Sequence, residues 1–545
     1  MNKIPFLALA LLSFISQSTF SQNTKYWIRF TDKNGSPYSV SNPSAFLTAK
    51  SIQRRTNQGL AIDMTDIPVN QSYVNQVAST GATVLERSRW FNAVVISVSS
   101  PSVLTSVNSL SCVASSTPVG RYTSVTHDVL TPVGPSAQKT SSTTAYNYGP
   151  SYTQVHQIGA DCLHNLGYRG QNMVIAVIDA GFNQADVNQV FDSLRNENRI
   201  LGTFDFVDGN TGVYEDDQHG AEVLSCIVGN SPGQLIGTGP KAQVWLLRSE
   251  NVFYEKKIEV CNWVVAAEYA DSVGADICST SLGYTTFDDA TQNYTYADLN
   301  GKTATASIAA TMAARKGMFM LNAAGNEGGG SWNYVGVPAD ADSICTVGSV
   351  NSGGAHSSFS SVGPTADGRI KPEISTMGEG TYVCAPGYSF FSGNGTSFAC
   401  PIAAGAVACL WQAHPTKSNM QILNAIKATA SKASTPDNQY GWGIPDFCAA
   451  HNYLTLNTGI SEQHANSSIQ LFPNPATTSI SFSLTETVES AYIMDVLGHS
   501  IAADLNTSNT STRHTLTFKD DLRAGIYLVN IKTATGYHTA KFIKQ

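Results

Sequence analysis

Charged residues are scarce in this chain of 545 residues. Asp, Glu, Lys and Arg together make up 13% of it, whereas proteins usually carry about 25%. The net charge is −8, and the sequence has no basic run suited to binding phosphates. This composition argues against nucleic acid as a partner. With 42% hydrophobic residues, it is that of a globular protein long enough for several domains.

Beyond the N-terminal residues, no segment looks transmembrane in the sequence. A short apolar run covers residues 6–15; it follows Lys3 and precedes small polar residues that end at Ser21. This pattern is typical of a secretory signal peptide. A membrane anchor is the alternative, but the run is too short for one. We therefore expect residues 1–21 to be removed and the rest to be exported as a soluble protein.

Cysteine patterns for zinc are also absent. The chain has 10 Cys, but no CxxC pair or Cys/His cluster has zinc spacing, so we reject a cysteine-based metal site. Nine of them fall between residues 150 and 455, and an odd number cannot all pair among themselves. Several lie in apolar runs typical of buried thiols. Export permits disulfides, but the sequence leaves their connectivity open.

The order of patterns along the chain predicts separate domains. Residues 22–128 contain strand-like runs at 26–30 and 90–98 and helix-like stretches at 44–58 and 71–77, which predict a small α+β domain. A segment rich in Pro, Ser and Thr follows and indicates an exposed linker. The expected organisation is a signal peptide (1–21), an N-terminal domain (22–128), a linker (129–151), a central domain (152–455), a second linker (456–470) and a C-terminal domain (471–545).

The central domain alternates apolar runs with helical stretches, which predicts an α/β fold: a parallel sheet with helices on both faces. The runs are 174–178, 244–247, 277–281, 318–321 and 344–348, and the helical stretches are about 256–272 and 303–316. The C-terminal domain instead consists of short alternating runs, such as 526–531 and 539–543 around a turn at Thr535-Gly536. That pattern predicts a small β-sandwich.

Residues 393–405 organise the central domain. Two glycines lead to Ser397, and Pro401 lies near the start of a helix of small residues. A side chain at a helix N-terminus lies beside unpaired N–H groups that stabilise negative charge, which suits a nucleophile that attacks a carbonyl. Taken alone, the stretch is equally consistent with an ordinary Ser- or Thr-capped helix.

Three other residues complete a possible catalytic set. Asp179 follows the run 174–178, His219 stands where a polar turn enters a helix, and Asn326 opens a glycine-rich loop after a strand. Singly, they are consistent with a turn former, a capping residue and a residue in left-handed backbone. Together they fit nucleophilic catalysis. His219 would take the proton of the nucleophile, Asp179 would orient His219, and the Asn326 amide would bind the oxyanion with a backbone N–H.

The blocks around Asp179, His219, Asn326 and Ser397, in this order, resemble the subtilisin-type serine proteases over roughly residues 150–455. Two positions depart from the family: Ala180 replaces a hydroxyl residue and Ala221 replaces Thr. The resemblance implies a secreted serine endopeptidase made as a zymogen, in which residues 22–128 inhibit the enzyme and the protease cuts its own linker. It also implies a substrate cleft lined by Ser281, Leu282, Gly283, Ala323, Ala324 and Gly325.

Specificity and metal content are less readable. Glu327 at the rim of the first substrate pocket would favour a basic side chain, although a solvated carboxylate attracts only weakly. We expect no cofactor for the chemistry. Calcium is common in the family, but no loop has a known calcium spacing, so structural calcium is left open.

Residues 471–476, 525–529 and 541–544 resemble the sorting domain of the bacterial type IX secretion system. The resemblance implies passage through the periplasm and recognition by the secretion machinery, and the alternative is a carbohydrate- or protein-binding sandwich. For the whole protein, the rival hypotheses are an inactive surface or adhesion protein and a hydrolase of other esters or amides. Against the second of these, the sequence around Ser397 lacks the Gly-x-Ser-x-Gly elbow of the α/β-hydrolases. Natural substrate, maturation sites, surface attachment and oligomeric state are left open.

Overall fold

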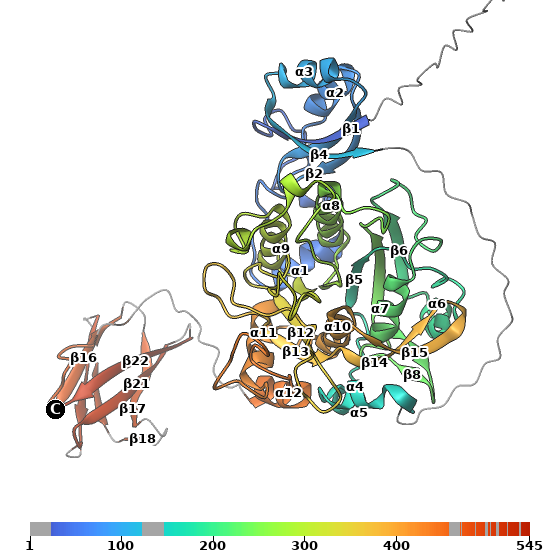
Figure 1. Cartoon of the computed structure of the whole chain (residues 1–545). Coiled ribbons are helices and arrows are strands. Elements are labelled where there is room, and N and C mark those ends of the chain that lie inside the picture. The colour runs from blue at the N-terminus through green and yellow to red at the C-terminus, as the bar shows by residue number, and fades with distance from the viewer. Residues whose placement is uncertain are drawn as a thin grey trace, which may run out of the picture. The chain divides into compact units, whose positions relative to one another are not determined.

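The computed structural model describes residues 23–122, 146–456 and most of 469–545. The expected signal peptide lies outside the described residues, as do residues 123–145 and 457–468 of the regions between domains. The chain divides into two compact units, 1–456 and 457–545, which are described separately. The first unit contains both the N-terminal domain and the α/β domain (Figure 1).

The N-terminal domain is a four-stranded antiparallel sheet in the order β2-β3-β1-β4. One sheet face, with Ile28, Val94 and Ile96, packs on the domain's own helices, and the other face, with Trp27 and Val95, packs on the α/β domain. Its elements are β1 (Asn23–Phe30), α1 (Ala49–Asn57), α2 (Gln71–Ser79), β2 (Thr83–Ser88), β3 (Ala93–Val98), α3 (Pro101–Asn108) and β4 (Val113–Tyr122).

Two expected elements of this domain are shorter than the sequence pattern suggested. The helix expected at 44–58 consists of a short 3-10 turn and then α1, because Thr48 caps a new helix by accepting a hydrogen bond from the Ser51 N–H. The strand expected at 90–98 begins at Ala93, because Asn92 has left-handed backbone (φ 51°) and turns the chain.

The central domain contains the expected parallel sheet, with seven strands in the order β13-β12-β11-β10-β5-β9-β6. All five apolar runs found in the sequence are strands of it. All six residues of β5 are buried, as a strand covered on both faces requires. The strands are β5 (Val174–Asp179), β6 (Ile200–Asp205), β9 (Gln243–Arg248), β10 (Ile277–Thr280), β11 (Phe319–Ala323), β12 (Cys345–Val350) and β13 (Ile374–Met377).

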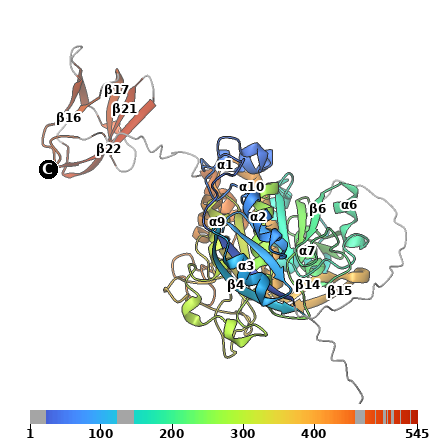
Figure 2. The ribbon, with the colours of Figure 1, turned by 90° about the horizontal axis from the view of Figure 1, so that it is seen from above.

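Helices cover both faces of this sheet. Alternate residues of β5 separate the two cores: Ile175 and Val177 pack with α7 and α10, whereas Ala176 and Ile178 pack with α8 and α9. The layers can be followed in Figure 1 and from above in Figure 2. The helices are α4 (Tyr152–His156), α5 (Ala160–Asn165), α6 (Asp192–Asn196), α7 (His219–Val228), α8 (Lys257–Val273), α9 (Thr305–Arg315), α10 (Thr396–Ala413), α11 (Asn419–Ala428) and α12 (Phe447–Leu456). Two short hairpins complete the domain: β7 (Asn230–Ser231) with β8 (Leu235–Ile236), and β14 (Glu379–Ala385) with β15 (Ser389–Asn394).

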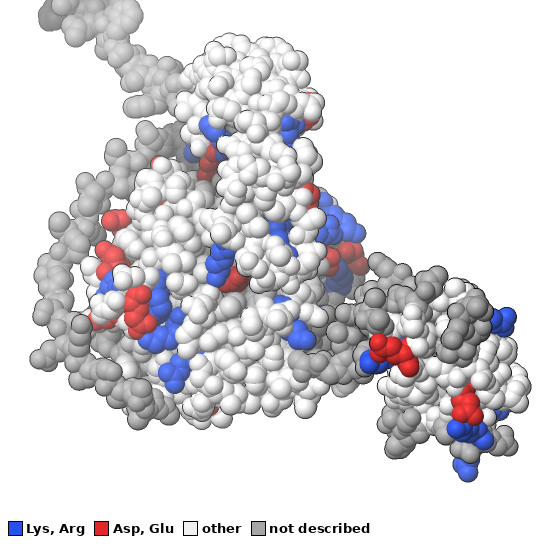
Figure 3. All heavy atoms as spheres, turned by 180° about the vertical axis from the view of Figure 1, so that it is seen from behind, with Lys and Arg blue, Asp and Glu red and all other residues white. Residues whose placement is uncertain are grey.

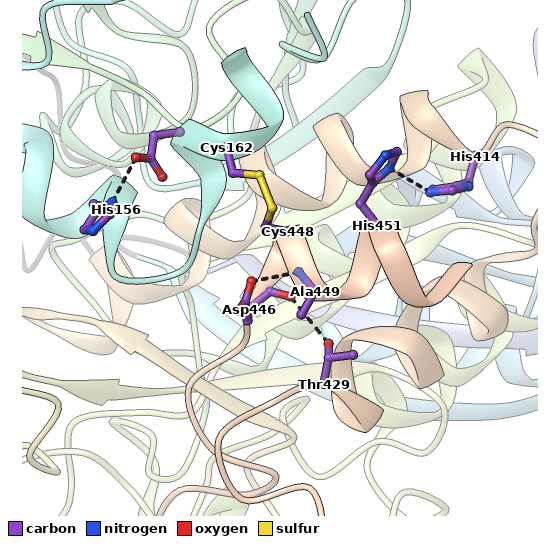
Figure 4. Close-up of a disulfide and its surroundings, with 9 residues drawn as sticks. His156, Cys162, His414, Thr429, Asp446, Cys448, Ala449 and His451 are labelled. Carbon is purple, nitrogen blue, oxygen red and sulfur yellow. Dashed lines mark hydrogen bonds and ion pairs between the residues drawn. A yellow bond between two sulfur atoms is a disulfide. The ribbon is translucent and has the colours of Figure 1, made fainter. Parts of the chain in front are cut away.

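Residues 146–151, expected as the end of the linker, pack into this domain. Tyr148 is buried, and its hydroxyl lies 2.8 Å from Nδ1 of His164. On the same side of the domain, the disulfide Cys162–Cys448 joins α5 to α12 (Figure 4). All ten cysteines are described, and the other eight are buried free thiols. The surface in Figure 3 carries few charged side chains, in keeping with the composition.

The second unit is a β-sandwich, as expected. A three-stranded sheet (β16-β20-β19) and a four-stranded sheet (β18-β17-β21-β22) share one core, which contains Phe482, Leu516, Val529 and Phe542. Along β21 from Tyr527 onward, buried and half-buried residues alternate. The strands are β16 (Ser479–Ser483), β17 (Val488–Asp495), β18 (Ser500–Ile501), β19 (Ala503–Thr507), β20 (Arg513–Phe518), β21 (Gly525–Thr533) and β22 (Gly536–Lys544).

Helix α10 is the central helix of the first unit. Among the described residues it is the one helix long and apolar enough to cross a membrane, but 89% of it is buried inside the unit. Gly405 lets it approach the chain closely: a Cβ at this position would lie 2.2 Å from Oγ1 of Thr238 and 2.6 Å from the backbone nitrogen of Gly239. The small residues of α10 therefore serve close packing.

We predict that Gly405→Ala destabilises the first unit by about 1–3 kcal/mol, because the added methyl must displace backbone. The measurement is denaturant-induced unfolding in a Ser397→Ala background, which avoids self-digestion. Gly353→Ala is the matched control, since Gly353 is exposed and an added Cβ would come no closer than 3.4 Å to its nearest neighbour. An equal free energy of unfolding for both variants and the parent would show that close packing at Gly405 does not contribute to stability.

Candidate active site

Asp179 and His219 meet at the carboxyl end of the sheet. Asp179 is the last residue of β5 and is fully buried, and His219 is the first residue of α7. The imidazole Nδ1 lies 2.7 Å from Oδ1 of Asp179. Gly220 permits this arrangement, because a Cβ there would lie 2.2 Å from the carbonyl oxygen of Gly181. The first turn of α7 can therefore rest directly on the end of β5.

The buried carboxylate controls the charge of the imidazole. Burial disfavours the imidazolium form, but the Asp179 carboxylate and its hydrogen bond outweigh this effect and raise the pKa of His219 to about 9. Glu222, one turn along α7, adds a smaller effect of the same sign, and burial raises the pKa of Glu222 itself. Oδ1 of Asp179 also accepts the Ala180 N–H at 2.8 Å. Within the described part of the chain, Oδ2 has no partner. Ala180 has no hydroxyl to offer it.

Ser397 is the second residue of α10 and is half-buried. Its hydroxyl donates to the carbonyl oxygen of Ser281 across 3.5 Å, rather than to His219. The ring of the next residue, Phe398, has its centroid 6.3 Å from that of His219, so the first turn of α10 lies beside the imidazole. To approach the imidazole of His219, the Ser397 hydroxyl must rotate about χ1.

Pro401 links this helix to the adjacent strand. In α10, its missing N–H leaves the carbonyl of Ser397, four residues earlier, without its usual helical donor. The hydroxyl of Ser281 fills that place by donating to the Ser397 carbonyl at 2.8 Å. The start of α10 is thereby fixed to the residue that follows β10.

Asn326 lies exposed in the loop after β11, and Thr396 orients it. The amide oxygen of Asn326 accepts hydrogen bonds from the backbone N–H of Thr396 (2.9 Å) and from its hydroxyl (3.0 Å). The same hydroxyl accepts the Gly325 N–H at 3.2 Å. With both donors on the oxygen, the amide nitrogen lies near Gly395, the N-cap of α10, where an added Cβ would be 3.9 Å from it.

The segments expected to line a cleft follow neighbouring strands, β10 and β11, and so lie at the same end of the sheet. The Asn322 side chain joins them by donating to the Leu282 carbonyl at 3.0 Å. Gly283 is exposed, and Leu282 and Gly325 are half-buried, whereas the side chains of Ser281, Ala323 and Ala324 are buried. These last three can therefore offer a ligand backbone groups rather than side chains. Glu327 is exposed, as expected for a rim position.

Sequence reasoning missed two contributors to this site. Thr396 holds Asn326, and the signal was a hydroxyl residue directly before Ser397. The charge of Glu222 helps to raise the pKa of His219. The sequence signal for it was an acidic residue three positions after His219, in the first turn of the expected helix. Among the residues that the structure describes, no group of three or more His, Cys, Asp or Glu side chains is arranged to hold a metal ion.

Comparison with known proteins identifies the family. Residues 170–443 match the description "Subtilase family". The chain belongs to the subtilase family. Residues 25–131 match a "Peptidase S8 propeptide domain, Bacteroidota", and residues 470–545 match a "Secretion system C-terminal sorting domain".

Curated relatives agree with this assignment. Subtilisin NAT of Bacillus subtilis subsp. natto and subtilisin E of Bacillus subtilis are each 32% identical over 312 residues, which cover 56% of this chain and 73% of theirs. Subtilisin of Bacillus pumilus is 32% identical over 54% of this chain and 97% of its own. The chain is a serine endopeptidase made as a zymogen with a propeptide, and its sorting domain marks it for secretion or the cell surface. The expectations for family, fold class, enzyme class and localisation are confirmed.

We predict that Asp179→Asn lowers the pKa of His219 from about 9 to below about 6.5, its ordinary value. The substitution removes the negative charge that raises the pKa, while the burial that lowers it remains. The measurement is an NMR titration of the imidazole in the Ser397→Ala zymogen. Glu222→Gln is the control and should lower the pKa by much less. A pKa that stays near 9 in Asp179→Asn would contradict the assigned cause.

Proposed function

We propose that this protease hydrolyses peptide bonds through an acyl-enzyme formed on Ser397, with His219 as general base and Asp179 as its orienting partner. The observation that supports this most directly is the 2.7 Å contact between Nδ1 of His219 and the buried Asp179 carboxylate, beside the first turn of the helix that carries Ser397. The contact leaves Nε2 as the imidazole atom available to the serine.

In the first half of the reaction, neutral His219 accepts the Ser397 proton at Nε2 as Oγ attacks the carbonyl carbon of the substrate. The imidazolium is stabilised by Asp179, and it returns the proton to the leaving amine as the C–N bond breaks. In the second half, His219 takes a proton from water as the water oxygen attacks the acyl carbon. The imidazolium then gives that proton to Oγ of Ser397 as the C–Oγ bond breaks, which releases the acid and restores the free hydroxyl. Protons and electrons balance without a cofactor, and we propose that none is required.

We assign the oxyanion hole to the Asn326 amide and the backbone N–H of Ser397. Both donors lie at the N-terminus of α10, where the helix dipole also favours negative charge. Thr396 pre-orients the amide by occupying its oxygen, so little reorganisation is needed when the charge develops. Removing one such donor in subtilisin costs about 10²–10³ in kcat.

We propose that an extended substrate peptide binds between residues 281–283 and 323–325 as an added strand. The exposed backbone of Gly283 suits such pairing. Glu327 at the rim would give a weak preference for a basic side chain, because its exposed carboxylate is screened by solvent. We further propose that the protease cuts its own linker between Leu130 and Tyr152 during maturation.

We predict that Ser397→Ala abolishes casein hydrolysis and leaves residues 22–128 attached when the protein is made in a protease-deficient host. Wild type made in the same way should lose them and should be labelled at Ser397 by phenylmethylsulfonyl fluoride. N-terminal sequencing and mass spectrometry give both readouts. Equal processing of the two proteins would assign maturation to another enzyme, and full activity after complete serine sulfonylation would remove Ser397 as nucleophile.

We predict that Asn326→Ala lowers kcat by about 10²–10³ with little change in KM, because the amide acts mainly on the transition state. Thr396→Val should lower kcat by a smaller factor, since it leaves the amide present but less well oriented. Steady-state kinetics on a peptide anilide measure both. An unchanged kcat in folded Asn326→Ala would exclude this residue from the oxyanion hole.

A further inference from the structure

A buried carboxylate on the catalytic domain has partners that come from the propeptide. Asp271 lies in the last turn of α8 and is fully buried. Arg54 donates to its Oδ1, and Arg55 (2.8 Å) and Arg89 (2.9 Å) donate to its Oδ2. All three arginines precede the linker. Burial opposes the negative charge, but these arginines outweigh it and lower the pKa of Asp271, so the carboxylate is ionised.

This residue is unfavourable for the helix that carries it. A negative charge in the last turn of a helix interacts poorly with the helix dipole. Burying an ion without partners costs several kcal/mol. Both penalties are offset in the zymogen, where Arg54 also donates to the carbonyl of Ala275 just beyond the helix end. The partners that stabilise the Asp271 carboxylate therefore come from the propeptide rather than from the catalytic domain.

The ion network continues across the domain boundary. Arg55 also contacts Asp66 of the propeptide at 2.9 Å, and Asp66 contacts Lys316 of the catalytic domain at 2.8 Å. Asp66 is fully buried, and Lys316 is nearly so. Charges of opposite sign thus alternate from one domain to the other. Such buried networks are weakened strongly by the loss of a single member, because the others remain desolvated.

Apart from Arg89, the propeptide members of this network belong to one segment, residues 48–67, which we call the strap. It contains α1 and lies below the propeptide sheet, at the level of α9 (Figure 1). Besides Asp271, the strap contacts residues that immediately precede strands of the catalytic sheet. Lys50 donates to the carbonyl of Asn172 (2.9 Å) before β5, and Gln58 donates to the carbonyl of Gly317 (2.8 Å) before β11.

The strap therefore contacts the amino end of the parallel sheet. Asp179, Asn326 and the cleft segments lie at its carboxyl end. Gln58 also contacts α11, because its side-chain oxygen accepts the Asn419 N–H at 3.0 Å. The packing is close, because a Cβ on Gly274 would lie 2.7 Å from Cβ of Lys50. Contacts at this end do not depend on whether the linker at residues 123–145 is intact.

We propose that the strap is a second docking element, which holds the propeptide on the catalytic domain through Asp271 after the linker has been cut. Cleavage of the linker then leaves a complex that these contacts still hold together. The propeptide dissociates when the contacts of Arg54 and Arg55 with Asp271 are lost. The proposal assumes that the linker is cut during maturation, but not that this protease cuts it.

The test uses full-length Ser397→Ala carrying a recognition sequence for a site-specific protease within residues 123–145. The protein is immobilised through its C-terminus and cut, and dissociation of the propeptide is followed with time. We expect slow release from this parent. In Arg54→Ala/Arg55→Ala, release should be at least about 100-fold faster, because Asp271 and Asp66 are left buried without those partners. As linker cleavage is supplied from outside, failure of the proposed self-processing does not affect the result.

The matched control is Gln53→Ala/Asn57→Ala, on the exposed face of the same helix, where these two side chains bond to each other. It should release the propeptide at the parental rate. If the double arginine variant does not fold, Asp271→Asn and Gln58→Ala replace it, each with an expected acceleration of about 10-fold or more. Folding of every variant is checked before cutting by its thermal melt.

Two outcomes would overturn the proposal. One is equal release from the parent and from the folded strap variants, which would mean that the propeptide sheet alone retains the inhibitor. The other is immediate release from the parent on cutting. As a further check, Asp271→Asn with Ser397 intact should have unchanged kcat/KM on a small peptide substrate once the propeptide has been removed.

Discussion

A carboxylate buried at the end of β5 is the constraint on which the candidate site depends. Asp179 is fully enclosed, so its charge needs a donor nearby. His219 supplies it, but only because Gly181 and Gly220 let the loop and α7 come within contact of β5. The parallel sheet places this pair at the same end as the loops after β10 and β11. The position of the imidazole thus follows from where one charge can be satisfied.

The sequence indicated the fold and the members of the site because both rest on local patterns. Six consecutive buried residues in β5 follow from one apolar run, and Asp179, His219, Asn326 and Ser397 each stand at a recognisable strand or helix boundary. Their orientation could not be read in this way. The role of Pro401 depends on Ser281, which is 116 residues before Ser397 and supplies the hydrogen bond that the proline removes.

Contacts between distant segments were the least predictable part. The Cys162–Cys448 disulfide joins residues 286 positions apart, and no spacing rule selects that pair among ten cysteines. Residues 146–151 have a linker's composition, yet Tyr148 finds a buried partner in His164. Arg55 and Asp271 are 216 residues apart, and nothing in the sequence near either one points to the other. Whether a charged side chain is solvated or needs a buried partner depends on its burial, which only the assembled fold determines.

The scarcity of charge gives those buried ions their significance. In a chain with only 13% charged residues, several charges that could have faced solvent are instead enclosed between the propeptide and the catalytic domain. The propeptide sheet already makes an apolar contact with the catalytic domain through Trp27 and Val95. A second apolar contact in place of these ions would enlarge the hydrophobic patch left on the mature enzyme, which would favour aggregation. Ionised groups return to water readily when the domains part. A charged contact at the amino end of the sheet can therefore hold an inhibitor firmly and still leave a soluble surface behind.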